Sequence, residues 1–169
     1  ISAVNDAPVL ATVSDVIFDE DGSGSTSLSA SDVDGDDLTY SISEGTDITA
    51  TLTDSDISFS APDNFNGSET FTVSTSDSEF TDSQTITVTV NAVNDAPVAD
   101  ATSGVTEEDQ SIVISLSGSD VDGDNLSFSV QNASNGSVSL DASFATYTPD
   151  ANYSGTDSFI FTVSDGLET

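Results

Sequence analysis

Apolar and polar residues alternate along most of this chain with a period of two, which is typical of half-buried antiparallel β-strands. Ile86, Val88 and Val90, for example, are separated by threonines that face the other way. No segment shows the 3.6-residue period of an amphipathic helix. Clusters of Gly, Asn, Asp and Ser interrupt the alternation and indicate turns. The strands expected in the first half are Val9–Phe18, Ser25–Leu28, Leu38–Ser43, Ile48–Leu52, Ile57–Ser60, Ser68–Ser76 and Gln84–Val93.

The pattern occurs twice, because the chain contains an internal repeat. The heptapeptide AVNDAPV stands at residues 3–9 and again at 92–98, a separation of 92 − 3 = 89 residues. The hexapeptide SDVDGD stands at 31–36 and again at 119–124, a separation of 119 − 31 = 88 residues. The change from 89 to 88 places a one-residue deletion in the first strand of the second repeat.

Short strands at this spacing predict an all-β chain of two tandem Greek-key β-sandwiches of the immunoglobulin or cadherin type. We expect the first repeat at residues 1–93, with residues 1–4 as the tail of a preceding repeat's last strand. The second repeat, at 94–169, lacks a counterpart of Gln84–Val93. It is therefore expected to be a truncated sandwich with one unpaired sheet edge, which favours association with other chains.

The charge balance excludes several classes of partner. The chain has 31 acidic residues and no Lys, Arg or His, which gives a formal net charge of −31 at pH 7. Nucleic acid binding needs basic side chains to neutralise phosphates, and an anionic membrane surface repels this chain. No apolar run approaches the roughly 20 residues of a membrane-spanning helix. The absence of cysteine excludes disulfides and zinc–cysteine sites.

Two acidic runs are candidates for metal binding: Asp32-Val33-Asp34-Gly35-Asp36 and its copy, which contains Asp120, Asp122 and Asp124. Residues two apart in an extended segment point the same way, so the leading carboxylates converge and repel unless a cation joins them. With oxygen ligands alone, the flexible coordination of Ca²⁺ suits such a site better than Mg²⁺ or zinc. The alternative interpretation is that these residues only form turns.

The motif order NDAPV, Glu-Asp, DVDGDxLTYSI and NFxGSETFTVSxSD resembles the cadherin-like tandem repeats of giant bacterial surface adhesins of the RTX type. The resemblance covers nearly the whole chain. It implies a secreted location on the bacterial cell surface, a role in cell adhesion or biofilm stalks, and Ca²⁺ bound at the junctions between neighbouring repeats.

The resemblance also implies ligands. Those expected at the complete junction are Glu20, Asn94, Asp95, Asp120, Asp122, Asp124 and Asp165. The equivalent group of the first repeat, without its preceding domain, is Asn5, Asp6, Asp32, Asp34, Asp36 and Asp77. Asp63, beside Asn64, stands where cadherins place a further acidic pair, and Glu108 would serve a following junction.

Three functions compete at this point. The first is a structural extender whose joints are stiffened by Ca²⁺ and whose partners are the neighbouring repeats of the same polypeptide. The second is a module that binds a surface glycan or makes homotypic contacts, although only Tyr40, Tyr147 and Tyr153 offer phenol rings. The third is an enzyme, which we do not expect: without His, Cys, Lys or Arg, most nucleophile–base pairs are unavailable, and only a two-carboxylate glycosidase remains formally open.

Overall fold

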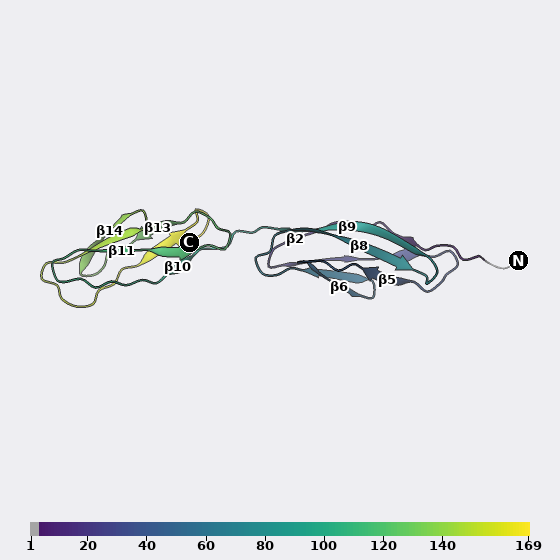
Figure 1. Ribbon diagram of the computed structural model, residues 1–169, viewed down its shortest axis with the longest axis horizontal. Helices are drawn as coiled ribbons and strands as arrows, with labels where there is room; N and C mark the ends of the chain where they lie inside the picture. Colours follow the sequence, from purple (N-terminus) through teal and green to yellow (C-terminus); the bar gives the residue numbers. More distant parts are fainter. Residues whose placement is uncertain (1–3) are drawn as a thin grey trace. The chain divides into compact units, whose positions relative to one another are not determined.

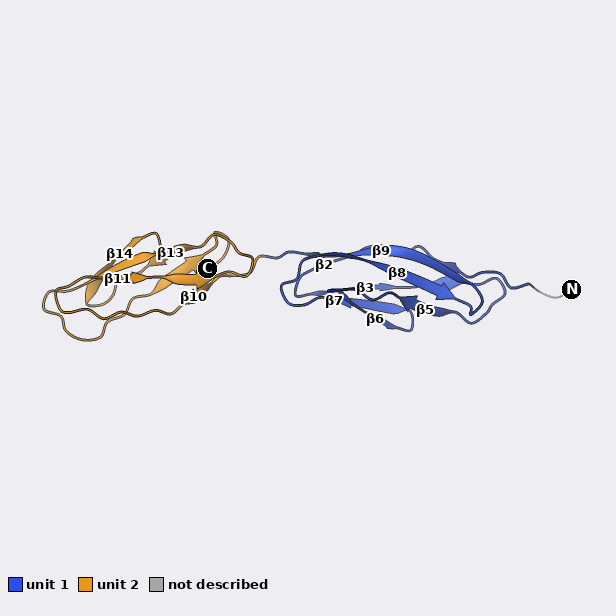
Figure 2. Ribbon diagram, viewed as in Figure 1, with its two compact units in different colours: residues 1–93 blue, residues 94–169 orange. Residues whose placement is uncertain are grey.

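The structure, a computed structural model, describes residues 4–169, which form β-strands joined by turns and loops (Figure 1). The chain divides into two compact units, residues 1–93 (unit 1) and 94–169 (unit 2), coloured separately in Figure 2. In the described range, no helix is long and apolar enough to cross a membrane. The predicted all-β class is confirmed. Residues 1–3, most of the expected tail of a preceding repeat, lie outside the described range.

Unit 1 is built from two main sheets. Their orders are β2-β9-β8-β5 and β3-β7-β6, and a third, two-stranded sheet pairs β1 with β4. Strand β2 runs parallel to β9, and the other pairs are antiparallel. The strands are β1 (Val9–Leu10), β2 (Val16–Asp19), β3 (Ser23–Ser27), β4 (Ala30–Ser31), β5 (Thr39–Ile42), β6 (Thr49–Thr53), β7 (Asp56–Ser60), β8 (Gly67–Ser76) and β9 (Thr81–Asn91).

The single strand expected from Val9 to Phe18 is wrong, because this segment changes partner halfway along. Strand β1 pairs with β4, whereas β2 pairs with β9. Between the two strands, side chains bond to the backbone in place of strand-to-strand hydrogen bonds. The Gln84 amide donates to the carbonyl of Leu10 at 3.0 Å, and its Oε1 accepts the N–H of Val13 at 3.1 Å. Asp15 Oδ1 accepts the N–H of Thr87 at 2.7 Å. These contacts allow the chain to cross from one sheet to the other.

The core of unit 1 lies between the two main sheets, and the strand alternation explains its membership. Phe59 on β7 and Phe71 on β8 meet edge to face, with ring centroids 5.4 Å apart, an arrangement favoured by the ring quadrupoles. The buried core residues are Leu10, Val16, Phe18, Leu28, Ile48, Ile57, Phe59, Phe71, Val73, Ile86, Val88 and Val90.

Unit 2 repeats most of this arrangement. Its sheets are β11-β15-β14, β13-β16 and β10-β12. Strand β16 pairs only with β13 among the described residues, whereas its counterpart β8 has both β5 and β9 as neighbours. The strands are β10 (Val98–Asp100), β11 (Ile112–Ser115), β12 (Ser117–Ser119), β13 (Ser127–Val130), β14 (Gly136–Asp141), β15 (Phe144–Pro149) and β16 (Phe161–Ser164).

The two units fill one layer of their cores with opposite residue sizes. In unit 1, Val16 and Phe18 are buried against Gly24, where an added Cβ would lie 2.6 Å from Val16 Cγ1 and 2.7 Å from Phe18 Cδ1. The equivalents of Val16 and Gly24 in unit 2 are Gly104 (16 + 88) and Ile112 (24 + 88). There the close approach is reversed, with a Cβ added at Gly104 lying 2.7 Å from Ile112 Cδ1. Unit 1 thus has its glycine on β3, at Gly24, whereas unit 2 has its glycine at the position equivalent to Val16, at Gly104.

This exchange predicts a compensating pair of substitutions. Gly24→Ile alone overpacks the core of unit 1 and is expected to cost about 1–3 kcal/mol of unfolding free energy. Adding Val16→Gly reproduces the small–large arrangement of unit 2 and should recover part of that loss. Denaturant unfolding of the single and double variants measures the coupling. Strictly additive costs would show that the two positions do not share space as described.

An acidic side chain at the same position of each unit holds a loop through backbone N–H groups. Glu69 accepts the N–H of Thr46 at 2.9 Å and of Asp47 at 2.7 Å. Burial by itself raises the pKa of Glu69, but these hydrogen bonds outweigh it and hold the pKa below its usual value. In unit 2, Asp157 accepts the N–H of Asn135 at 2.9 Å, and its pKa is lowered by the same balance.

The lowered pKa of Glu69 predicts how acid weakens unit 1. A group whose pKa falls on folding contributes stability that is complete above its unfolded pKa and is lost as pH drops through the folded value. Glu69→Gln should therefore lower the free energy of unfolding of unit 1 most above pH 4.5. In stronger acid, the unfolding free energies of the variant and of the unchanged chain should become more similar. Unfolding curves at several pH values measure this gap. Glu44→Gln, at an exposed position, is the matched control and should leave no such pH-dependent gap.

Candidate metal centres

The acidic loop of unit 1, residues 32–36, folds around the carboxylate of Asp32. Asp32 Oδ1 accepts the backbone N–H groups of Asp34, Gly35 and Asp36 at 2.8, 3.0 and 3.3 Å. Gly35 has a φ of 80°, a left-handed conformation that costs glycine little. Carboxylate oxygens of Asp32, Asp34 and Asp36 lie within 4.8 Å of one another. The loop therefore gathers three negative groups, of which the spacing predicted the convergence of the leading two.

The N-terminal segment contacts both this loop and Asp77. The backbone N–H of Asp6 donates to Asp34 Oδ2 at 2.7 Å, and the Asn5 amide donates to Asp77 Oδ2 at 2.9 Å. Asp77 is itself buried, and its Oδ1 accepts the N–H of Phe80 at 2.6 Å. The hydrogen bond from Phe80 contributes most to lowering the pKa of Asp77. The adjacent residues Asn5 and Asp6 thus contact two other members of the predicted group, Asp77 and Asp34.

Unit 2 builds the same loop from residues 120–124. Carboxylate oxygens of Asp120, Asp122 and Asp124 lie within 4.8 Å of one another. Asp120 Oδ1 accepts the N–H of Asp124 at 3.2 Å, and Gly123 has a φ of 79°, almost the value of Gly35. The backbone conformation of the loop is therefore a property of the repeat.

The partners of the second loop are also equivalent to those of the first. The N–H of Asp95 donates to Asp122 Oδ2 at 2.7 Å, and the Asn94 amide donates to Asp165 Oδ2 at 2.8 Å, a contact that lowers the pKa of Asp165. The sequence difference after this aspartate, Ser78 in one repeat and Gly166 in the other, changes little, because their φ angles are 85° and 100°. Asp77 and Asp165 thus have the same position in the two units.

The electrostatics of the acidic loop are unfavourable without a counter-charge. Burial raises the pKa of Asp36, and the neighbouring charges of Asp32 and Asp34 raise it further. One oxygen of each leading aspartate, Asp32 Oδ2 and Asp120 Oδ2, is buried and has no hydrogen-bond partner in the part of the chain that the structure describes. Unpartnered buried carboxylate oxygens are costly unless a cation accepts their lone pairs.

A divalent cation fits these two loops by its chemistry. Each loop presents several carboxylate oxygens and no nitrogen or sulfur ligand, since the chain contains neither His nor Cys. Ca²⁺ accepts six to eight such oxygens in flexible geometry. Asp32, Asp34 and Asp36 would hold it in unit 1, and Asp120, Asp122 and Asp124 in unit 2. Asn5 contacts Asp77 and Asn94 contacts Asp165, and both pairs add side-chain oxygens to the same end of their unit.

Glu20 lies elsewhere in unit 1, next to the last residues of that unit. Its backbone N–H donates to the carbonyl of Asn91 at 2.9 Å, and its Oε1 accepts the N–H of Val93 at 2.5 Å. Only 6% of its surface is exposed, and Oε2 is a buried oxygen for which the described residues supply no hydrogen bond. An almost fully buried carboxylate with one unused oxygen is the expected state of a ligand that needs a cation.

Asp63 and Glu108 are not brought into either acidic loop. Asp63 is exposed, but its neighbour Asn64, with φ 56°, donates its N–H to Asp21 Oδ1 at 3.0 Å. This contact holds the turn of Asp63 beside the turn that follows Glu20. Glu108, the counterpart of Glu20 (20 + 88), is exposed.

Sequence reasoning missed the backbone part of these sites. The N–H groups that orient Asp32, and those of Asp6 and Asp95 that orient the second aspartate of each loop, carry no side-chain signature. The available signal was Gly at the fourth position of DxDG, which permits the left-handed turn. For Glu20 the backbone partner Val93 lies 73 residues away, beyond the reach of local patterns.

Comparison with known proteins supports the tandem arrangement. The bacterial Ig domain family matches the chain twice, over residues 5–89 and 94–169. Two crystal structures of the human protocadherin-24 EC1-2 fragment are 19% identical to the chain. One has a TM-score of 0.56 and covers 95% of this chain and 94% of its own, and the other has 0.62 with 94% and 87%. The curated proteins contain no match.

The likeness to protocadherin concerns the fold alone, because the identity is low. It agrees with the predicted immunoglobulin or cadherin type of sandwich. The family match rests on the sequence of both units and covers most of the chain. The chain therefore belongs to the bacterial Ig domain family and carries two copies of that domain in tandem.

Proposed function

We propose that this chain is a calcium-stabilised spacer of a secreted bacterial surface adhesin, with its neighbouring repeats as partners and no catalytic role. The observation that carries the proposal is a buried oxygen of Asp32 and of Asp120, for which residues 4–169 supply no hydrogen bond, each inside a cluster of three carboxylates. Both copies of the repeat have the same arrangement, in a chain that has no basic side chain to neutralise it. Divalent cations supply the missing positive charge.

The position of Glu20 extends the proposal to the joint between repeats. Glu20 is held by the backbone of Val93, the last residue of unit 1, and the next two residues, Asn94 and Asp95, contact the acidic group of unit 2. The residue whose N–H contacts Glu20, Val93, thus directly precedes Asn94, which contacts Asp165 of unit 2. Ions shared between these groups would stiffen the linker, as the resemblance to cadherin-like repeats implies.

The proposal predicts that the leading aspartate of each loop is needed for Ca²⁺ binding. Asp120→Asn removes one negative charge from the cluster and should weaken Ca²⁺ binding at that loop at least about tenfold, which corresponds to about 1.4 kcal/mol. Isothermal titration with Ca²⁺ measures the loss, and Asp32→Asn should produce the same loss in unit 1.

Asp141→Asn is the matched control for Asp120→Asn. Asp141 is an exposed aspartate of the same unit at the end of β14, so the variant has the same change in net charge but leaves the loop intact. Ca²⁺ affinity should be unchanged. Equal weakening by both variants would mean that Ca²⁺ responds only to the overall charge, and the proposed sites would be wrong.

The proposal also predicts that chelation loosens and destabilises the chain. A ligand bound only to the folded state stabilises it by about 2.7 kcal/mol at one hundred times its Kd. Removing Ca²⁺ should therefore lower the melting temperature, and small-angle scattering should report a broader range of conformations. Unchanged melting and scattering after chelation would contradict the role.

Glu20→Gln tests the joint separately from the two loops. This variant should make the scattering of the Ca²⁺-loaded chain resemble that of the chelated chain. Glu108→Gln is the matched control, since Glu108 has the equivalent position in unit 2 but is exposed. It should leave the scattering unchanged.

A further inference from the structure

The outer face of sheet β11-β15-β14 in unit 2 has an apolar corner formed by Phe144 and Val113, which we call the Phe144 patch. Phe144 on β15 is 52% exposed, and Val113 on β11 is 61% exposed. Phe144 pairs with Ser115, and Val113 is two residues from Ser115 on the same strand, so both side chains project from the same side of the sheet. Diagonal cross-strand neighbours lie about 7–8 Å apart, within reach of an aromatic ring. The two side chains thus present one continuous apolar surface to solvent.

Unit 1 has polar residues in place of this patch. The equivalents are Asp56 (56 + 88 = 144) and Ser25 (25 + 88 = 113), which are both exposed. They stand on β7 and β3, the strands that correspond to β15 and β11. Because the same sandwich forms with two polar residues here, the core does not require the apolar pair of unit 2. Adjacent exposed apolar residues without a packing role are typical of interaction sites.

Hydroxyl side chains surround the Phe144 patch. Ser115 lies directly opposite Phe144, and Thr146 lies directly opposite Val113. Ser139 on β14 is in turn paired with Thr146. Within residues 4–169, none of these three hydroxyl groups has a hydrogen-bond partner. Each hydroxyl can therefore both donate a hydrogen bond to a bound molecule and accept one from it.

The electrostatics and the size of this face exclude several kinds of ligand. Asp141 on β14 pairs with Phe144, and the whole chain has a formal net charge of −31 with no basic residue. Phosphorylated, sulfated or acidic ligands would therefore be repelled. A stable protein interface covers about 800 Å² on each partner, which is far more than two side chains provide.

A neutral sugar ring fits the properties that remain. One face of a pyranose ring presents C–H groups that pack against an exposed aromatic ring, while the hydroxyl groups project from the edge of the sugar. Binding sites for small molecules combine apolar contact with a few polar groups that fix the orientation of the ligand. The Phe144 patch supplies the apolar contact, and the surrounding serine and threonine hydroxyls supply the polar groups.

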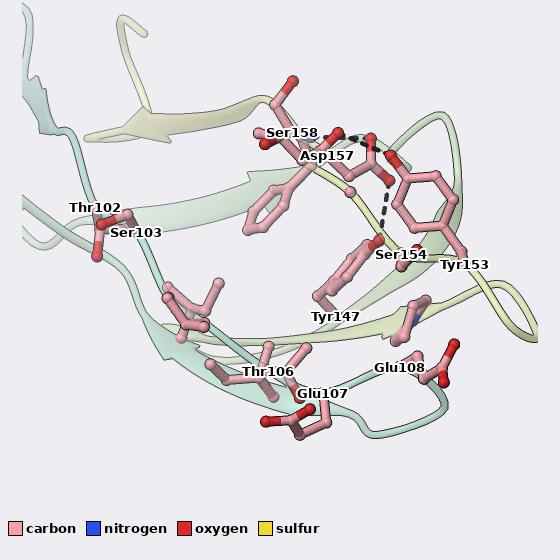
Figure 3. Close-up of a pocket in the computed structure, with 18 of the residues that line it drawn as sticks. Thr102, Ser103, Thr106, Glu107, Glu108, Tyr147, Tyr153, Ser154, Asp157 and Ser158 are labelled. Atoms are coloured by element: carbon pink, nitrogen blue, oxygen red, sulfur yellow. Dashed lines mark hydrogen bonds between the residues drawn. The ribbon is translucent and has the colours of Figure 1, made fainter.

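Tyr147, Tyr153 and Phe80 do not offer an equivalent surface. The Tyr147 hydroxyl donates to Asp157 Oδ2 at 3.0 Å and the Tyr153 hydroxyl to the carbonyl of Thr156 at 2.8 Å, and both rings line a cavity of unit 2 (Figure 3). Phe80 is 43% exposed, but it lies in the turn between β8 and β9 and not on a sheet face. The ring on β15 is therefore the candidate for stacking against a sugar.

We propose that the outer face of sheet β11-β15-β14 binds a neutral polysaccharide. One sugar ring stacks on Phe144 and Val113, and its hydroxyl groups form hydrogen bonds with Ser115, Thr146 and Ser139. The site uses no residue of the acidic loops, so it is independent of the proposed Ca²⁺ sites. It also belongs to unit 2 alone, which gives the two repeats different roles.

Affinity electrophoresis of the full 169-residue chain tests this site, in native gels that contain a soluble glucan, mannan or galactan. We expect at least one of these neutral polysaccharides to retard the chain. Phe144→Ser removes the stacking surface and should weaken that binding at least about tenfold. A set of gels in which no polysaccharide retards the chain would overturn the proposal.

Phe80→Ser is the matched control for Phe144→Ser, because it removes an exposed aromatic ring from unit 1 of the same chain. It should leave the retardation unchanged, and thermal unfolding checks that both variants remain folded. Equal loss of binding in the two variants would mean that the polysaccharide adsorbs to any exposed ring, and the assigned site would be wrong.

Sedimentation velocity distinguishes sugar binding from self-association through the same patch. The chain and its Phe144→Ser variant should sediment alike in the absence of polysaccharide. A change of oligomeric state in the variant, with no retardation of the unchanged chain by any polysaccharide, would overturn the inference and identify a contact between two copies.

Transfer of the patch to unit 1 provides a gain-of-function test. Ser25→Val and Asp56→Phe, introduced together into the Phe144→Ser chain, recreate the apolar pair on a face that already has the matching hydroxyl neighbours Ser27, Thr51 and Ser58. Retardation by the same polysaccharide should return. A folded variant that still migrates freely would contradict the role assigned to the pair.

Discussion

Carboxylate repulsion without any basic side chain is the constraint on which this molecule depends. Each repeat nevertheless draws three aspartates together and buries one of their oxygens, to which no group in the described part of the chain donates a hydrogen bond. Backbone N–H groups orient these side chains, but they do not neutralise the charge. A cation that prefers oxygen ligands would neutralise this charge. Under the proposed function, Ca²⁺ bound there would stabilise each unit and the segment that joins them.

The scaffold explains how such loops are positioned. Sheets packed around an apolar core fix the ends of the strands between which the acidic loops lie. The loop spans residues 32–36, between β4 and β5, in one repeat and residues 120–124, between β12 and β13, in the other. The residues of the core differ between the repeats: Val16 and Gly24 of unit 1 correspond to Gly104 and Ile112 of unit 2. The acidic loops keep their residues and the positive φ of their glycine, 80° at Gly35 and 79° at Gly123.

Strand β9 contributes to unit 1 through backbone pairing, core packing and side-chain hydrogen bonds. It pairs with β2 and β8, covers the core with Ile86 and Val88, and uses Gln84 to hold the segment that crosses between sheets. In unit 2, residues 104–107 and 155–159, the counterparts of β2 and of part of β8, line a cavity.

The amino-acid sequence by itself determined the strand class, the repeat and the clustering of Asp32, Asp34 and Asp36, because alternation and short spacings act over a few residues. Only the tertiary structure decided where Val9–Phe18 breaks, since Gln84 and Asp15 compete with the ladder through contacts more than 70 residues apart. The burial of Glu20 against Val93 likewise comes from long-range packing. Local patterns carry no information about which distant backbone group will cover a side chain.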